Sequence, residues 1–206
     1  MTFTEPGAIE KRSMEIIESE LDAPVSEEIK DVVLRVIHCT ADFDYARSLA
    51  FSANAVKNAR QALAAGNCTV VTDTRMAYSG INKAAAAKLG CAIRCFMSDE
   101  DVAAEAKERG CTRAQVSMER AAKIEGSVIF AVGNAPTALL ALAEMAREGR
   151  IKPALIIGVP VGFVNVVESK EEITACGAEY IVARGRKGGS NVAAAIVNAL
   201  MYGITR

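Results

Sequence analysis

The only histidine of the chain, His38, is the residue best suited to acid–base chemistry. It stands at the end of an apolar, helix-like repeat and is followed by the polar segment CTADFD. A helix C-terminus favours the protonated imidazole, and we expect the nearby Asp42 and Asp44 to act in the same direction. These features indicate a proton donor. Because there is no second histidine, a multi-histidine metal site is excluded.

Two further polar residues have two interpretations each. Ser13 shares a predicted helical face with Ile9 and Ile16, so its hydroxyl is expected to point inward. There it bonds either back to the carbonyl at position 9 or to a ligand against the helix. Arg113 directly follows the presumed helix cap Thr112, where the helix dipole disfavours a cation. It is either a solvated surface arginine or part of an anion site, since an anionic ligand would reverse that preference.

Three loops are expected to follow strand ends, where this type of fold binds ligands. They are DTRMAYSGI (73–81), VGNAPTALL (132–140) and GVPVGFVN (158–165). Gly133, Gly158 and Gly162 would let the backbone approach a ligand closely.

The segment RGRKGGSN (184–191) combines three cations, Arg184, Arg186 and Lys187, with three glycines before a helix. Such a loop is a plausible nest for a carboxylate or phosphate. Neither GxGxxG nor GxxxxGK[ST] occurs in the chain, which argues against the two common nucleotide-binding sites.

The six cysteines indicate buried free thiols rather than disulfides or a zinc site. Cys91 and Cys95 are four residues apart, but no second pair and no nearby histidine completes a zinc ligand set. Together with an N-terminus that lacks the apolar stretch of a signal peptide, this predicts a reduced, cytoplasmic protein. Cys39, next to the histidine, is read as a small filling residue, the alternative being a reactive thiol.

The N-terminal third predicts helices. Pro6 suits a first helical turn, and a turn is expected around Asp22-Ala23-Pro24. The apolar spacing of SEEIKDVVLRVIH predicts a helix over 27–38 with Ser26 as its N-cap and His38 in its last turn. A third helix is expected over 53–65, ending at Gly66.

From there β-branched runs alternate with Ala-rich helical segments. The expected strands are 68–72, 92–96, 127–132, 154–158 and 180–183. Five helices are expected between and after these strands. The first lies between Ser79 and Gly90, and the second begins at Ser98 with Asp101 and ends at Gly110. The third begins at Thr112, the fourth begins near Pro136, and the last runs from Ser190 to Tyr202. This pattern predicts an α/β fold with a doubly wound, mainly parallel five-stranded sheet. Residues 1–206 form one domain, with an N-terminal helical segment (1–66) before the sheet core (67–206).

The overall composition narrows the function classes. The 24 basic and 25 acidic residues leave a net charge of −1, so no global field draws the chain to nucleic acid or an anionic membrane. No apolar run approaches the ~18 residues of a transmembrane helix. Anion recognition must therefore come from local clusters.

Five segments together resemble one family. RVIHCTAD, DTRMAYSGI, VGNAPTALL, IGVPVGFVNVVESKE and GRKGGSNVAAAIVNAL, in this order and spacing, are similar to the precorrin-8X methylmutases of cobalamin biosynthesis, also called cobalt-precorrin-8 methylmutases. The resemblance extends from about Pro6 to the last helix. Cys39 is its chief departure, because small polar or apolar residues are common in the family at that position.

The resemblance implies an isomerase that moves a methyl group from C11 to C12 of the macrocycle, giving hydrogenobyrinate or cobyrinate. No external methyl donor is needed, so no cofactor and no metal are expected. His38, in the R-x-x-H motif with Arg35, is implied to protonate or hydrogen-bond the ring C nitrogen. The family is typically a homodimer with its substrate near the subunit interface. Substrate contacts are expected from Ser13, Arg35, Arg75, Arg113, Gly133, Asn134, Gly158, Gly162, Arg186 and Lys187.

Two other function classes remain as alternatives: a non-catalytic tetrapyrrole carrier and a nucleotide-dependent enzyme on a Rossmann-like sheet. A carrier has no need of a proton donor at His38, and the nucleotide enzyme lacks its usual fingerprints. The substrate class favours the first interpretation, because a flat apolar macrocycle rimmed with carboxylates suits small apolar loops and dispersed cations.

Overall fold

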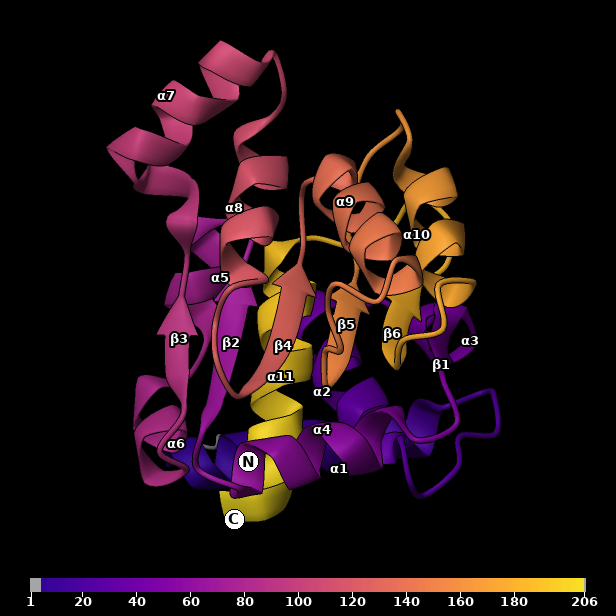
Figure 1. Cartoon of the computed structure of the whole chain (residues 1–206). Helices are drawn as coiled ribbons and strands as arrows, with labels where there is room; N and C mark the ends of the chain where they lie inside the picture. Colours follow the sequence, from indigo (N-terminus) through magenta and orange to yellow (C-terminus); the bar gives the residue numbers. More distant parts are fainter. Residues whose placement is uncertain (1–4, 206) are drawn as a thin grey trace.

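A six-stranded sheet forms the centre of the molecule in a computed structural model that describes residues 5–205 (Figure 1). Its order is β1-β6-β5-β4-β2-β3. All neighbouring strands are parallel except β1, which pairs antiparallel with β6. The strands are β1 (Leu49–Phe51), β2 (Cys68–Thr72), β3 (Ala92–Arg94), β4 (Ser127–Val132), β5 (Leu155–Gly158) and β6 (Tyr180–Ala183).

The predicted five-strand sheet is thus one strand short. The five expected strands are all present, but β1 lies inside the segment that we expected to be wholly helical. Three residues are too few to show a strand periodicity, and the pairing of Leu49 with Ala183 depends on a strand far along the chain. The predicted strand 92–96 ends at Arg94, because Phe96–Ser98 form a short 3₁₀ helix, η1.

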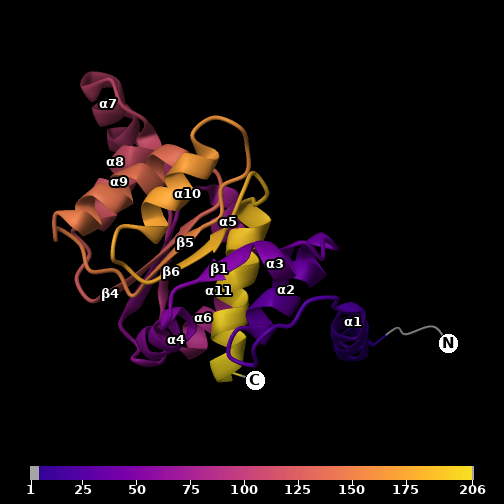
Figure 2. The ribbon, with the colours of Figure 1, turned by 90° about the vertical axis from the view of Figure 1, so that its right-hand side faces the viewer.

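One face of the sheet is covered by helices around the C-terminal helix α11 (Ser190–Thr205), seen in Figure 2. Ten of its residues are buried, among them Ile196 and Leu200. A helix that is apolar all round is expected to be buried in this way. The other helices of this layer are α1 (Pro6–Glu20), α2 (Lys30–Thr40), α3 (Tyr45–Ser48), α4 (Ala55–Ala64), α5 (Arg75–Gly80) and α6 (Lys83–Lys88).

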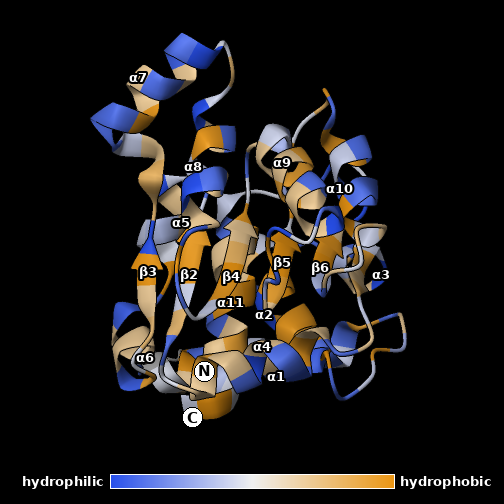
Figure 3. Ribbon diagram, in the orientation of Figure 1, coloured by the Kyte–Doolittle hydropathy of each residue, from blue (hydrophilic) through white to orange (hydrophobic). Residues whose placement is uncertain are grey.

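The opposite face carries α7 (Glu100–Arg109), α8 (Arg113–Ala121), α9 (Pro136–Arg147) and α10 (Val166–Thr174). Its core joins Phe130 of β4 to Leu139 and Leu142 of α9. Figure 3 shows the strands between the two layers in the hydrophobic colours, as expected for a parallel sheet buried on both faces. Helices on both faces confirm the doubly wound fold. None of the helices described is both long and apolar enough to span a membrane.

Several helix boundaries were wrong. The helix α2 begins at Lys30 rather than 27, and its N-cap is Ile29, with no side-chain bond from Ser26. The helix expected between Ser79 and Gly90 is the shorter α6, and a separate helix, α5, precedes it. The chain turns after Gly80, and Asn82 caps α6 by accepting the N–H of Ala85. The helix α4 begins at Ala55, α7 begins at Glu100 without a side-chain cap, and α10 was not predicted.

Other boundaries are confirmed. Pro6 and Pro136 stand in the first turns of α1 and α9. Thr112 caps α8 by accepting the N–H of Gln115 at 3.2 Å. Gly110 ends α7 in the left-handed conformation, with φ +63°. In each case one residue decides the boundary through its own backbone or side chain, which is why sequence locates it.

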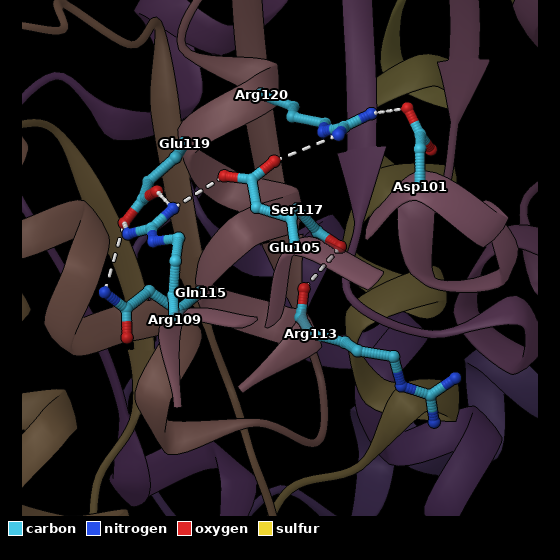
Figure 4. Close-up of polar contacts among 8 residues, drawn as sticks. All are labelled: Asp101, Glu105, Arg109, Arg113, Gln115, Ser117, Glu119 and Arg120. Carbon is cyan, nitrogen blue, oxygen red and sulfur yellow. Dashed lines mark hydrogen bonds and ion pairs between the residues drawn. The ribbon is translucent and has the colours of Figure 1, made fainter. Parts of the chain in front are cut away.

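The helix α7 is joined to α8 by an ion-pair network (Figure 4). Arg109 contacts Glu105 at 2.7 Å and Glu119 at 3.0 Å, and Arg120 contacts Glu105 at 3.0 Å as well as Asp101. Beneath it only a small apolar cluster around Val102 holds the two helices. The projecting α7 is therefore held by exposed charges together with this small cluster.

These exposed ion pairs predict that α7 responds to salt. Raising the salt from about 0.1 to 1 M shortens the Debye length from roughly 10 to 3 Å and screens exposed pairs. We expect amide hydrogen exchange of α7 to rise severalfold while that of α9, which packs in the main core, stays the same. Equal exchange of α7 at both salt concentrations would mean that the apolar cluster alone holds this helix.

Candidate functional site

The carboxyl ends of the parallel strands β2–β6 share one edge of the sheet, and the loops that follow them form the candidate site. These loops contain Arg75, Gly133 with Asn134, Gly162, and Arg186 with Lys187. This edge, which the sequence predicted as the ligand edge, therefore brings together most of the residues expected to contact substrate.

His38 lies in the last turn of α2 with an exposed side chain. Its imidazole forms no hydrogen bond with any residue of the described chain, so both ring nitrogens are available to a ligand. The neighbouring Cys39 Sγ accepts a hydrogen bond from Asn191 Nδ2 at 3.6 Å, which joins the end of α2 to the start of α11. The histidine therefore stands beside the edge where α11 begins. Burial raises the pKa of the Cys39 thiol, in keeping with an unreactive residue.

Asp42 and Asp44, which we expected to act on His38, are paired with a lysine instead. Both carboxylates bind Lys187 Nζ, each at 2.6 Å. The hydrogen bond from Lys187 lowers the pKa of Asp42 and the pair raises the pKa of Lys187. The ammonium of Lys187 therefore already has two carboxylate partners, and these ion pairs join the loop after α2 to the loop after β6.

The loops after β5 and β6 are joined by their backbones. The N–H of Gly189 donates to Val159 O at 2.8 Å and the N–H of Gly162 donates to Arg186 O at 3.1 Å. A side chain at Gly188 would collide with the carbonyl oxygen of Val159, so only glycine fits there. The two loops form one unit along the edge.

Asp73 is a site-building residue that sequence reasoning missed. Its side chain is 1% exposed, and its carboxylate accepts the N–H groups of Gly133 at 2.8 Å, Asn134 at 2.8 Å and Ala135 at 2.7 Å. Burial raises its pKa, and the three N–H bonds oppose that effect by stabilising the charged form. The one available signal was its place directly after a buried strand. The three bonds of the Asp73 carboxylate fix the loop between β4 and α9.

Two of the glycines expected near a ligand allow loops and side chains to pack closely. A Cβ on Gly133 would lie 2.6 Å from Cα of Ser190, and one on Gly158 would lie 3.3 Å from Leu139. Ser190 also shares a 2.8 Å hydroxyl contact with Thr74, the cap of α5. The loops after β2 and β4 therefore meet at the N-terminus of α11.

The arginines divide into two groups within the part of the chain that the structure describes. Those away from the ligand edge form ion pairs with carboxylates, as Arg35 does with Glu10 and Arg147 with Glu172. Those without a carboxylate partner all lie along the ligand edge and are exposed: Arg75, Arg94, Arg113, Arg184 and Arg186. In Figure 4 the side chain of Arg113 points away from the α7–α8 network, and its guanidinium reaches only Met97 O at 3.4 Å.

Apolar side chains are exposed at the same edge. Phe163 and Val164, in the loop between β5 and α10, are 80% and 77% exposed, and Met76 at the start of α5 is 70% exposed. The guanidinium of Arg186 lies 5.3 Å from the centre of the Phe163 ring. The edge thus offers apolar contact surface and unpaired positive charge together, which suits a flat ligand with an anionic rim.

Residues 8–203 match the family model of precorrin-8X methylmutase. The chain belongs to this family. It is 45% identical to the cobalt-precorrin-8 methylmutase of Priestia megaterium, covering 95% of this chain and 87% of that one. It is 43% identical to the precorrin-8X methylmutase of Pseudomonas aeruginosa over 94% and 93% of the two chains. The crystal structure of the precorrin-8X methylmutase from Thermus thermophilus superposes with a TM-score of 0.87 at 37% identity, covering 95% and 96%.

Family membership makes the chain an isomerase and confirms the resemblance inferred from the five segments. The fold agrees as well, since the six-stranded α/β architecture is shared with a methylmutase of known structure. Among the described residues no group of His, Cys, Asp and Glu could hold a metal ion.

Two expected contacts lie away from the ligand edge. Arg35 Nη2 binds Glu10 Oε1 at 2.6 Å, and its guanidinium stacks 5.2 Å from the Tyr202 ring. Ser13 bonds back to Ile9 O at 2.9 Å, which is the first of its two interpretations. The face of α1 that carries Ser13 is also more exposed than expected, because Ile9 remains 44% exposed. A hollow of about 420 Å³ is lined by residues of α1 and by Arg35.

Proposed function

We propose that this methylmutase moves the methyl group from C11 to C12 of precorrin-8X or cobalt-precorrin-8, with His38 as the general acid. The products are hydrogenobyrinate and cobyrinate. The shift is intramolecular, so the bond to C11 breaks as the bond to C12 forms and no methyl donor enters. No cofactor is needed for this step.

The observation that carries the proposal is the set of unpaired arginines at the ligand edge. A corrinoid carries acetate and propionate carboxylates around its rim, and a guanidinium binds a carboxylate through two parallel hydrogen bonds. Arginines elsewhere in the described chain already have such partners, whereas those at the edge do not. The exposed Phe163 and Val164 supply contacts for the apolar faces of the ring.

His38 supplies the proton. Donation of an N–H to the ring C nitrogen, or protonation of it, draws electron density from the conjugated system in which the methyl group migrates. The imidazole stands at the C-terminal end of α2, exposed and without a hydrogen bond in the described chain, so it is free to meet the macrocycle. The proton returns to the histidine when the product forms, so the residue acts catalytically.

The proposal is tested by incubating the protein with precorrin-8X and, separately, with cobalt-precorrin-8. The visible spectrum follows the change in conjugation as the corrin product forms. Relatives named for either substrate match this chain almost equally, at 45% and 43% identity, so both forms are needed. Binding of both without any spectral conversion would instead indicate a tetrapyrrole carrier.

Arg113 provides a quantitative prediction. Arg113→Ala is expected to weaken corrinoid binding by about 1.5–3 kcal/mol, the scale of a hydrogen bond to a charged group. Arg113→Lys should recover only part, because an ammonium lacks the planar fork of the guanidinium. The matched control is Arg12→Ala, which removes an exposed arginine paired with Glu15 on α1. Equal affinities of Arg113→Ala and the control in a titration would remove Arg113 from the site.

We further propose that the protein is a cytoplasmic homodimer. Exposed apolar residues on α1, Ile9 at 44% and Ile16 at 39%, support a contact between subunits near the histidine-bearing helix α2. The free thiols of all six cysteines suit a reducing compartment. Sedimentation equilibrium of the purified protein tests the dimer.

A further inference from the structure

A lysine on α10 is completely buried. Lys170 is 0% exposed, although lysine is almost never fully buried without partners. Its ammonium donates to the backbone oxygens of Gly185 at 2.8 Å and Lys187 at 2.9 Å. Neither partner is a carboxylate, so the cation is held by peptide oxygens alone within the described chain. Both oxygens belong to the basic loop after β6, residues 184–189.

These bonds determine which way the basic loop faces. Three successive carbonyl groups of the loop are hydrogen-bonded within the protein, those of Gly185 and Lys187 by Lys170 and that of Arg186 by the N–H of Gly162. The N–H groups of residues 185–188 donate no hydrogen bond within the part of the chain that the structure describes. The N–H groups of the loop and the exposed guanidinium groups of Arg184 and Arg186 are therefore available to a ligand.

Lys170 also connects this loop to a second one. The helix α10 follows the loop that carries the exposed Phe163 and Val164. A single ammonium on α10 thus fixes the apolar loop and the basic loop relative to each other. Burial lowers its pKa to about 8, while the two carbonyl contacts favour the charged form, so the ammonium persists at neutral pH.

We propose that Lys170 is a positioning residue of the substrate site. By drawing the carbonyl groups of the basic loop inward, it turns the N–H groups and the arginines of that loop toward the carboxylates of the macrocycle. It also holds them at a fixed place beside the apolar loop. The part that concerns the macrocycle rests on the proposed function, whereas the effect on the loop does not.

The test compares Lys170→Met with Ser169→Ala. Methionine fills the same space without donors. Ser169 is an equally buried neighbour whose hydroxyl donates to Val166 O of its own helix and to no other group that the structure describes. In Lys170→Met we expect amide exchange at Gly162 and Gly189 to rise about tenfold or more, because the variant loses one to two charge-assisted hydrogen bonds. Exchange in β4 and α9 should stay unchanged. Ser169→Ala should resemble the wild type throughout.

Product binding gives the second readout. Hydrogenobyrinate should bind Lys170→Met about tenfold more weakly and with a flatter salt dependence, because the loop arginines no longer converge on it. The Michaelis constant should rise more than kcat falls. If Lys170→Met does not fold, Lys170→Gln replaces it, since its amide can still donate to one carbonyl and the same local pattern is expected.

Three outcomes decide the matter. Unchanged exchange in the two loops, or a rise spread evenly over the sheet, overturns the positioning role. Faster amide exchange in the two loops, together with wild-type affinity for the product, overturns the link to substrate. If the wild-type protein itself binds neither the product nor the substrate, the proposed function fails, while the exchange data still decide whether Lys170 holds the loop.

Discussion

His38→Ala is expected to lower turnover by about 10²–10⁴-fold, the range typical of a lost general acid. The imidazole is exposed and forms no hydrogen bond in the described chain, so its removal breaks no buried contact. The free energy of unfolding and the affinity for product should therefore stay close to those of the wild type. Single-turnover kinetics with precorrin-8X measures the effect.

The control for this variant is Cys39→Ala. Cys39 is also exposed in the last turn of α2, and its thiol has a raised pKa, so it should be dispensable. His38→Gln separates two modes of action, because glutamine can donate a hydrogen bond without delivering a proton. Activity of His38→Gln near that of the wild type would indicate hydrogen bonding, whereas wild-type turnover of His38→Ala would rule out the proposed mechanism.

The parallel core of the fold could be predicted because each of its elements carries a local signal. The runs at 68–72, 127–132 and 180–183 are β-branched and bounded by turns, and the strands have these limits. The missing strand β1 has only three residues and exists because β6 offers it a partner. The separate helix α5 was missed because its six residues, RMAYSG, are too few to show a helical repeat.

The site was predictable in place but not in detail. Parallel strands bring their carboxyl ends to one edge whatever their sequence, so the loops with Arg75, Asn134 and Arg186 could be assigned to it. Which carboxylate meets which cation depends on distant segments. Asp42 binds Lys187, 145 residues away, rather than its sequence neighbour His38.

The two polar groups that hold the site loops were missed for a single reason. Asp73 and Lys170 stand within segments that were quoted for other residues, and in sequence they look like ordinary surface charges. Only the packed structure reveals that both are buried and that their partners are backbone groups of other loops. A buried charge needs such partners, but sequence gives no count of the peptide groups around it.

Asp73→Asn is expected to lower the free energy of unfolding by about 2–4 kcal/mol. One carboxylate oxygen of Asp73 accepts the N–H of Gly133, and the other accepts those of Asn134 and Ala135. An amide turns one of these oxygens into a donor, which loses at least one charge-assisted bond, worth about 1.5–3 kcal/mol, and leaves a buried N–H unsatisfied. Urea unfolding at neutral pH measures the difference.

The matched control is Asp99→Asn, which makes the same chemical change at an exposed residue near the same edge of the sheet. We expect it to alter stability by less than about 0.5 kcal/mol, as for most surface substitutions. Asp73→Asn should also loosen the loop between β4 and α9, seen as faster amide exchange at Asn134 and Ala135. Because that loop lies against Ser190 at the start of α11, corrinoid affinity should fall with it. Equal stability of the two variants would mean that the buried carboxylate gains no more from its three N–H partners than burial takes away.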